Sequence, residues 1–311
     1  MRVPASVSGA GHKETWELNA LALTTLKEFL QPETVREASE ILRSHEDTAM
    51  VIGGGTFIHG LVARGLVTHV EQLVDLSRLN LDQIEFSRKA VRLGSSVTFT
   101  DLETSPEMRS SALLGALNDA VAYPPPQVKN AATIGGCVGA SCPFLDIPIA
   151  LLALDAKVTI AGTSGERKLP IEDLFVSLFQ TSLEVGEFLT EFSVPIPSKS
   201  SASAFEKLET SANDLSIVSA AARLSSGWMS GKGARIFVGG GIGEVPFRCR
   251  EAEAALENSK FTQADIERAA AAAGKEIEPF SDHRASAAYR KHMTGVLVRR
   301  CLERAAQQLE S

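Results

Sequence analysis

The first residues that could do chemistry form a glycine-rich loop, GGGT at positions 53–56, directly after the apolar run AMVI. A strand, then glycines, then the start of a helix places backbone N–H groups and a threonine hydroxyl where phosphate oxygens could bind. The loop lacks the lysine of a P-loop and the spacing of a Rossmann G-x-G-x-x-G turn. By itself it therefore predicts either a pyrophosphate-binding loop or an ordinary tight turn.

A second loop, NAATIGG at positions 130–136, again combines a threonine with paired glycines, and Asp146 follows in the apolar sequence PFLDIP. Two such loops in one domain could hold an extended dinucleotide at two separate points without a Rossmann unit. An acid in an apolar setting needs a hydrogen-bonding partner. Asp146 is therefore interpreted either as a ligand of a cofactor hydroxyl or as the N-cap of a helix that contains Pro148.

Two further sets of residues are predicted to have structural roles rather than to bind a ligand. The cluster GGGIG at 239–243 follows the strand ARIFV, but Pro246 comes too soon for a phosphate-binding helix to start, so a turn is predicted. Among the four cysteines there is one loose pair, Cys137 and Cys142, which does not match the short paired spacings of zinc or iron–sulfur sites. The cysteines are predicted to be unliganded thiols.

The elements that must position these loops follow from the hydrophobic pattern. Up to position 197, strands are predicted at 49–52, 72–76, 83–86, 90–93 and 157–160, and helices at 33–45 and 110–122. Beyond it, strands are predicted at 204–208, 216–224 and 234–238, and helices at 250–258, 262–273 and 282–309. Because strands and helices mix without a regular βαβ alternation, the predicted fold class is α+β.

Three parts are expected along the chain. Residues 1–24 read as a polar N-terminal extension, 25–197 as the first domain and 204–311 as a smaller second domain. The prolines at 195 and 197 and the Ser/Lys/Ala stretch up to Ala204 are typical of a linker. With 311 residues, the chain is long enough for two domains with cores of their own.

Composition excludes several classes of function. The 31 basic and 38 acidic residues give a net charge of −7, which argues against a basic surface for nucleic acid. The longest apolar run, 147–154, is far shorter than the roughly twenty residues that cross a bilayer. The first residues lack the apolar stretch of a secretory signal peptide, so a cytoplasmic location is expected.

Taken in order, these segments resemble the FAD-binding subunit of the molybdenum hydroxylases, the family of xanthine dehydrogenase, aldehyde oxidoreductase and aerobic carbon monoxide dehydrogenase. The matching segments are GGGT at 53–56, QVKNAATIGG at 127–136, and PFLD at 143–146 followed by LLALDAKV. The segments FEKLETSANDLSIVSAAARL, ARIFVGGGIGEVPFR and SDHRASAAYRKHM are similar to the family's second domain.

This resemblance covers residues 26–308 and implies a fold. The first domain would be an FAD-binding domain of the vanillyl-alcohol-oxidase or p-cresol-methylhydroxylase type, built as two subdomains. A smaller α+β C-terminal domain of the carbon monoxide dehydrogenase flavoprotein type would follow it.

The resemblance also implies which residues bind FAD. The first FAD loop would be Val51, Ile52, Gly53, Gly54, Gly55, Thr56, Phe57 and Ile58, with backbone N–H groups on the pyrophosphate, and the second would be Ala132, Thr133, Ile134, Gly135 and Gly136. Asp146 would hydrogen-bond the ribityl chain, and Tyr123 would lie against the flavin ring. Leu215 and Lys232 would contact the flavin side and the adenine side. The alternatives are a core aromatic for Tyr123, a helix-facing leucine for Leu215 and a solvated lysine for Lys232.

Three positions depart from the family pattern. Cys137 stands where an asparagine usually follows T-I-G-G, Phe57 replaces the common acidic residue after the first loop, and Lys129 replaces the commoner arginine. The change at Cys137 puts one side-chain hydrogen bond near the cofactor in question. No cysteine-rich insertion follows the second loop, so the additional iron–sulfur cluster of the hydroxybenzoyl-CoA reductase branch is expected to be absent.

The function implied is that of one subunit in an oxidoreductase complex. This chain would carry FAD, take electrons from [2Fe-2S] clusters on a small subunit and pass them to an external acceptor such as NAD, oxygen or a quinone. A large subunit with the molybdenum cofactor would oxidise the substrate, in a heterotrimer or a dimer of heterotrimers. No residue here is expected to act as a catalytic acid, base or nucleophile or to ligate a metal. The alternatives are a stand-alone FAD-dependent oxidase or dehydrogenase and a non-catalytic assembly subunit with a decayed flavin site.

Overall fold

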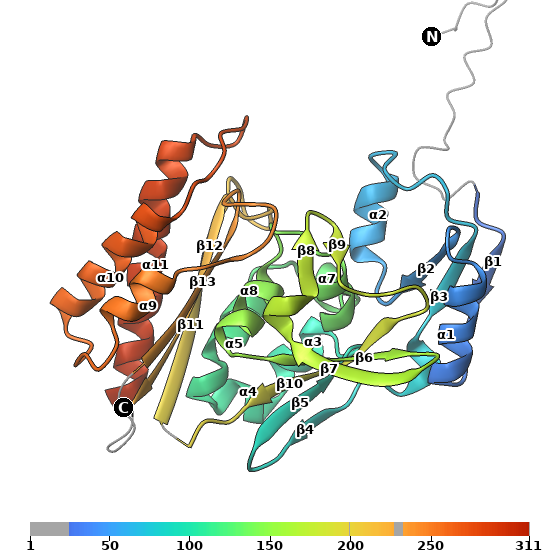
Figure 1. The fold of residues 1–311 in the computed structure, drawn as a ribbon, viewed down its shortest axis with the longest axis horizontal. Coiled ribbons are helices and arrows are strands. Elements are labelled where there is room, and N and C mark those ends of the chain that lie inside the picture. Colours follow the sequence, from blue (N-terminus) through green and yellow to red (C-terminus); the bar gives the residue numbers. More distant parts are fainter. Residues whose placement is uncertain (1–24, 199, 227–232, 311) are drawn as a thin grey trace, which may run out of the picture.

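The computed structural model describes residues 25–198, 200–226 and 233–310, and the strands in them form three sheets and a short hairpin (Figure 1). The first two sheets belong to residues 25–198 and the third to the part that follows. Each sheet is accompanied by helices, so the fold is the α+β arrangement that was predicted, with two subdomains in the first domain. The predicted N-terminal extension, 1–24, lies outside the described residues.

A small parallel sheet opens the fold, in the order β1, β3, β2. Its strands are β1 (Glu28–Leu30), β2 (Ala49–Ile52) and β3 (Gln72–Asp75), and its helices are α1 (Val35–Ser44) and α2 (Thr56–Val62). The side chain of Thr34 accepts a hydrogen bond from the N–H of Glu37 and so caps α1. Ala38 and Leu42 of α1 pack against Val74 of β3. This packing supports β3 and its neighbour β2, whose end carries the first glycine loop.

The second sheet is antiparallel, in the order β4, β5, β10, β6, β7. Its strands are β4 (Ile84–Phe86), β5 (Ala90–Gly94), β6 (Lys157–Gly162), β7 (Gly165–Pro170) and β10 (Phe188–Pro195). The helices of this subdomain are α3 (Phe99–Thr104), α4 (Pro106–Ser110), α5 (Gly115–Ala122), α6 (Pro126–Lys129), α7 (Ile134–Gly139) and α8 (Asp146–Ala153), and β8 (Phe175–Ser177) and β9 (Gln180–Thr181) form the hairpin. Every residue of α8 is buried, as expected for a helix that is enclosed on all sides.

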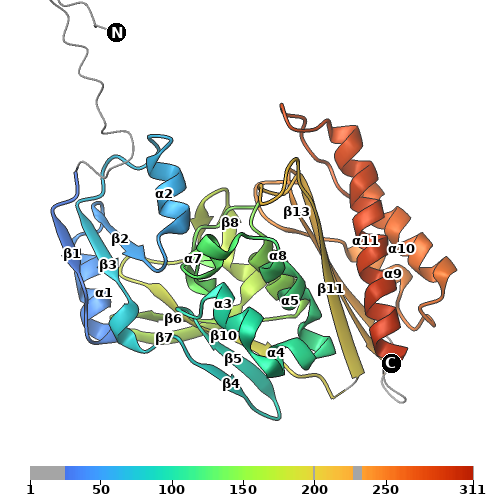
Figure 2. The ribbon, with the colours of Figure 1, turned by 180° about the vertical axis from the view of Figure 1, so that it is seen from behind.

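The third sheet has the order β11, β12, β13, β14 and is covered on both faces. Its elements are β11 (Ser200–Leu208), β12 (Val218–Ser226), β13 (Gly233–Gly240), β14 (Phe247–Arg248), α9 (Arg250–Ala255), α10 (Gln263–Glu276) and α11 (Ala287–Glu310). Helix α11 packs on β11 and β12, with α10 beside it, whereas α5 and α8 of the first domain contact the same sheet from the other side (Figure 2). Successive side chains of a strand point to opposite faces of the sheet, so neighbouring residues pack in different cores. Phe205 and Ala221 pack in the core with α5 and α8, whereas Ala204 and Ala220 pack in the core with α10 and α11.

The predicted linker is shorter than the sequence suggested. Strand β11 already begins at Ser200, so 200–204, which were predicted as linker, pair with β12. The small residues have a packing role that composition alone does not reveal. Ala202 and Ala204 are buried, and the Ser203 hydroxyl donates to the carbonyl of Leu113 (2.6 Å) and accepts from the N–H of Ala116 (2.9 Å).

A network of charges also ties the third sheet to the first domain. Asp155, which follows α8, binds Nη2 of Arg223 at 2.5 Å and Nε of Arg235 at 2.9 Å. Arg223 donates as well to the carbonyl of Leu154 (3.2 Å). The two domains therefore share polar and apolar contacts around α8.

Within the described ranges, none of the helices combines the length and the apolar character needed to cross a membrane.

Candidate functional site

The two predicted glycine loops lie directly against each other. A Cβ on Gly53 would be 2.5 Å from Oγ1 of Thr133, and a Cβ on Gly54 would overlap the carbonyl oxygen of Ala131. Only glycine permits such a close approach of two backbones. Gly55 then takes a φ of 67° and begins α2, so the first loop turns sharply from β2 into a helix. Segments far apart in the sequence thus form one continuous surface.

The two loops differ in what their N–H groups do. In the second loop, the N–H groups of Ile134, Gly135 and Gly136 donate to Val97 O (3.0 Å), Ser95 O (2.8 Å) and Thr133 Oγ1 (3.1 Å). Helix α2, in contrast, begins at Thr56 after the N-cap residue Gly55 and has no side-chain cap. The N–H groups of its first turn have no acceptor within the helix. The first loop is therefore the one whose N–H groups are available to an anion.

Asp146 is the first residue of α8 but not its N-cap, a position held by Leu145. Its buried carboxylate accepts a hydrogen bond at Oδ2 from Nζ of Lys207 (2.9 Å), whereas Oδ1 has no partner among the described residues. An unpartnered buried oxygen costs free energy unless water or a ligand donates to it. The N-cap interpretation is therefore wrong, because the side chain turns to the second domain; the role as ligand of a cofactor hydroxyl stays a prediction.

The carboxylate of Asp146 also lies near α7, the helix that starts at the second glycine loop. Burial raises the pKa of the Cys137 thiol in α7, and the charge of Asp146 raises it further. Burial likewise raises the pKa of Asp146 itself to about 6, against the opposing effect of Lys207. Asp146 therefore lies close to the helix that follows the second loop, and Cys137 there is a neutral thiol.

Tyr123 ends α5 and contacts both domains. Its ring meets that of Phe205 edge-on, with 5.8 Å between centroids, and its hydroxyl accepts from the N–H of Lys207 (3.2 Å). Burial raises the pKa of Tyr123 to about 12, so the phenol stays neutral. The ring packs against the core, as one of the two interpretations requires, and it is only half-buried. Its contact with a flavin ring stays a prediction.

Leu215 lies in the loop before β12, where the residue is 39% exposed. The carbonyl of Leu215 accepts from the Arg284 guanidinium, which also binds Asp214 Oδ2 at 3.0 Å. The neighbouring Ser216 hydroxyl donates to the carbonyl of Phe144 (3.0 Å), two residues before Asp146. The segment 214–216 is thus fixed between Arg284 and the start of α8, with the Leu215 side chain left open. Lys232, the predicted contact on the adenine side, lies outside the described residues.

The departures from the family pattern have partners within the protein. The ring of Phe57 lies 6.0 Å from that of Phe179 in the β8–β9 turn, and Nζ of Lys129 is 2.5 Å from Oε1 of Glu103.

The third glycine cluster behaves as the predicted turn. Gly240 ends β13 with its N–H donating to the carbonyl of Pro143 (2.7 Å), and the chain then turns into β14.

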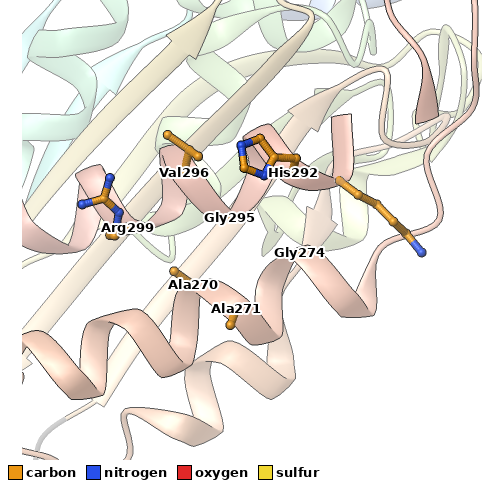
Figure 3. A pocket seen from close by; sticks show the side chains of 8 residues that line it. Ala270, Ala271, Gly274, His292, Gly295, Val296 and Arg299 are labelled. Atoms are coloured by element: carbon orange, nitrogen blue, oxygen red, sulfur yellow. The ribbon is translucent and has the colours of Figure 1, made fainter. Parts of the chain in front are cut away.

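A groove of about 370 Å³ lies elsewhere, between α10 and α11 (Figure 3). Gly274 and Gly295 line it at the crossing of the two helices, and a Cβ on either would lie 3.1 Å from a carbonyl oxygen of the other helix. The groove contains none of the predicted FAD-binding residues and is separated from α5 and α8 by the third sheet. It is therefore not part of the glycine-loop site.

Sequence reasoning missed Lys207 and Arg284, which hold Asp146 and the 214–216 segment. Both lie within segments that resemble the family's second domain, but neither has a motif that marks it as a site residue. The signal that could have found Lys207 is its position in a buried strand, where a lysine needs an acidic partner.

Two family models match the chain. The FAD binding domain in molybdopterin dehydrogenase matches residues 24–197, and the CO dehydrogenase flavoprotein C-terminal domain matches residues 203–305. The 6-hydroxypseudooxynicotine dehydrogenase complex subunit alpha of Paenarthrobacter nicotinovorans is 33% identical over 284 residues, which cover 89% of this chain and 94% of the relative. The glyceraldehyde dehydrogenase medium chain of Sulfolobus acidocaldarius is 28% identical and covers 89% and 98%.

Solved structures agree over the same length. A chain of carbon monoxide dehydrogenase from Hydrogenophaga pseudoflava superposes with a TM-score of 0.83 at 28% identity, over 91% of this chain and 98% of that one. Quinoline 2-oxidoreductase from Pseudomonas putida 86 gives 0.83 at 25% identity, over 93% and 100%. The fold, the two matching models and the relatives confirm the resemblance, and the chain belongs to the FAD-binding medium subunits of the molybdenum hydroxylase family of oxidoreductases.

Proposed function

We propose that this chain is the electron-transfer subunit of a molybdenum hydroxylase complex. It takes electrons from [2Fe-2S] clusters on a small partner subunit and passes them to an external acceptor, while a large subunit with the molybdenum cofactor oxidises the substrate. The names of the relatives support this assignment, because they include a subunit of a dehydrogenase complex and a medium chain. We further propose that the complex is a heterotrimer or a dimer of heterotrimers and works in the cytoplasm.

One observation carries the proposal for the cofactor site. The two glycine loops are in contact, and the second leads into α7, which packs on α8; Asp146 begins α8, and its Oδ1 has no partner among the described residues. An uncapped helix start suits a pyrophosphate, and a buried carboxylate oxygen without a donor suits a hydroxyl of a polyol chain. The residues present therefore fit FAD. When bound, FAD supplies the chemistry that links electron pairs to single electrons.

The residues of this chain bind and orient that group. The backbone of Val51–Ile58 would hold the pyrophosphate, and 132–136 would support it from the second loop. Asp146 would accept a hydrogen bond from the ribityl chain, Tyr123 would lie against the ring, and Leu215 would face the flavin side; the proposed adenine contact of Lys232 completes the set. The protein thereby controls the position and the potential of the cofactor.

Purification of the full chain with FAD, followed by a visible absorption spectrum, tests this function. We expect flavin bands at one FAD per chain. We also expect that candidate substrates of the complex do not bleach these bands unless the small and large partner subunits are added. A colourless chain would show instead a non-catalytic subunit, and direct bleaching by an organic substrate would show a stand-alone oxidase or dehydrogenase.

The Arg284→Gln variant tests the proposed role of the 214–216 segment. Glutamine removes the ion pair with Asp214 and the guanidinium contact with the carbonyl of Leu215. We expect the dissociation constant of FAD to rise about tenfold, or about 1.4 kcal/mol, as measured by quenching of flavin fluorescence. The matched variant Arg268→Gln, which breaks a surface pair with Asp265, should bind FAD as the wild type does. Equal affinity in both variants would exclude a role of this segment in binding.

A further inference from the structure

Lys207 occupies an unusual position for a lysine. It lies near the end of β11 in the second domain, and its side chain is only 5% exposed. Its ammonium is 2.9 Å from Oδ2 of Asp146 and 3.2 Å from Oε2 of Glu209, and it lies 5.3 Å from the centroid of the Tyr123 ring. A buried ammonium is costly unless it is paired, and this one has two carboxylates and an aromatic ring around it.

The two carboxylate oxygens of Asp146 differ in their hydrogen bonding. Oδ2 is engaged by Lys207, and Oδ1 is buried with no donor among the described residues. The ammonium therefore fixes the carboxylate by one oxygen and leaves the other free to accept from a ligand. The contact also crosses the boundary between the two domains, because Asp146 begins α8 and Lys207 belongs to β11.

Other titratable groups act on this pair from the elements around it. Glu209 lies just beyond the end of β11, Cys137 lies in α7 and Tyr123 at the end of α5. The phenol of Tyr123 is influenced in turn by Asp119 of α5 and Glu206 of β11. The thiol and the phenol are neutral because burial raises the pKa of each. Among these groups, Lys207 is thus the cation that contacts the Asp146 carboxylate.

We propose that Lys207 is a positioning residue of the flavin site: its ammonium keeps the Asp146 carboxylate ionised and oriented, so that Oδ1 can accept a hydrogen bond from a hydroxyl of the cofactor's polyol chain. This inference rests on the proposed FAD site and adds to it a residue of the second domain. A carboxylate accepts such a bond more strongly than a neutral carboxyl group does. The affinity for FAD should therefore depend on the protonation of Asp146.

Lys207 and Glu209 have opposite effects on the pKa of Asp146. Replacing each of them is therefore expected to shift the pH dependence of FAD binding in opposite directions. Burial raises the pKa of Asp146, Lys207 lowers it and Glu209 raises it, and together they bring it to about 6. Removing the ammonium in Lys207→Met lets Asp146 keep its proton to higher pH, so FAD affinity should be lost at higher pH than in the wild type. Removing the charge of Glu209 in Glu209→Gln favours the ionised form, so affinity should persist to lower pH.

The experiment is a titration of the FAD-free full chain with FAD between pH 5 and 9, followed by flavin fluorescence. We expect Lys207→Met to raise the pH midpoint of binding by about one unit and to weaken binding at pH 5 about tenfold, and Glu209→Gln to lower the midpoint. Lys207→Arg should restore the wild-type midpoint. Asp146→Asn should bind weakly without this pH dependence, and Lys168→Met, at an exposed lysine of β7, should behave as the wild type.

The outcomes separate the two proposals. If the wild type binds FAD but Lys207→Met does not move the pH midpoint, Lys207 is structural and this inference is wrong, while the proposed function stands. If Lys207→Met does not fold, Lys207→Gln, which keeps a hydrogen-bond donor but no charge, is titrated in its place, and an unchanged midpoint in that variant overturns the inference. If the wild type binds no FAD at any pH, both proposals are overturned.

Discussion

Replacing Gly54 by alanine is expected to weaken FAD binding by about 100-fold or more, which corresponds to about 2.7 kcal/mol. The new methyl group would overlap the carbonyl oxygen of Ala131, a backbone atom that cannot rotate away. The first glycine loop must then move from the second, and the start of α2 moves with it. Flavin fluorescence titration measures the loss, and circular dichroism shows whether the rest of the chain remains folded.

Gly60→Ala is the matched control for this variant. Gly60 lies within α2, and a Cβ there would be 3.3 Å from the flexible end of Arg64. Alanine favours a helix more than glycine does, so FAD affinity should be unchanged and stability equal or higher. Wild-type affinity in Gly54→Ala would mean that the contact of the two loops does not position the cofactor site.

Replacing Arg290 by methionine is expected to lower the free energy of unfolding by about 3–5 kcal/mol, the usual cost of breaking a buried charged pair. Arg290 is fully buried in α11, donates to the carbonyl of Ile217 (2.5 Å) and binds Asp282 Oδ1 (2.6 Å). Methionine fills a similar volume but removes the guanidinium from both oxygens, which keep only backbone donors: the N–H of Gly241 for Ile217, and those of Arg284 and Ala285 for Asp282. Urea denaturation followed by circular dichroism measures the change.

The same substitution at Arg300 provides the comparison. Arg300 is exposed on the same helix, and Arg300→Met should change the free energy of unfolding by no more than about 0.5 kcal/mol. Similar stability of the two variants would contradict the role of Arg290 in holding β12 against α11. Since Ile217 follows the 214–216 segment, Arg290→Met should also weaken FAD binding slightly.

Local patterns were enough to find the binding loops. The strand before Gly53, the glycines themselves and the Thr133 cap are set by neighbours in sequence, so their types and spacing carry the information. The α+β class also followed from the order of strands and helices. The resemblance of residues 26–308 added the family, which the matching models confirm.

Long-range contacts could not be predicted in the same way. Strand β10 pairs in the middle of the second sheet with β5 and β6, and the sequence pattern before Pro195 did not mark it as a strand. The interpretation of Asp146 stayed open because its partner, Lys207, is far along the chain and on another domain. Such pairs depend on which surfaces the whole fold brings together. The pattern within a dozen neighbouring residues does not contain that information.

The third sheet packs against helices of both domains, and this limits how the chain can be recombined with a relative. Phe205, Ala221 and Phe237 belong to the same hydrophobic core as the buried residues of α5 and α8. A cut between the two family-model matches, after residue 197, would thus divide one core and expose its apolar faces to water. A working chimera with the C-terminal part of a relative would need the facing surfaces of α5 and α8 from the same parent. Neither half of the chain alone is therefore a unit that can be exchanged intact.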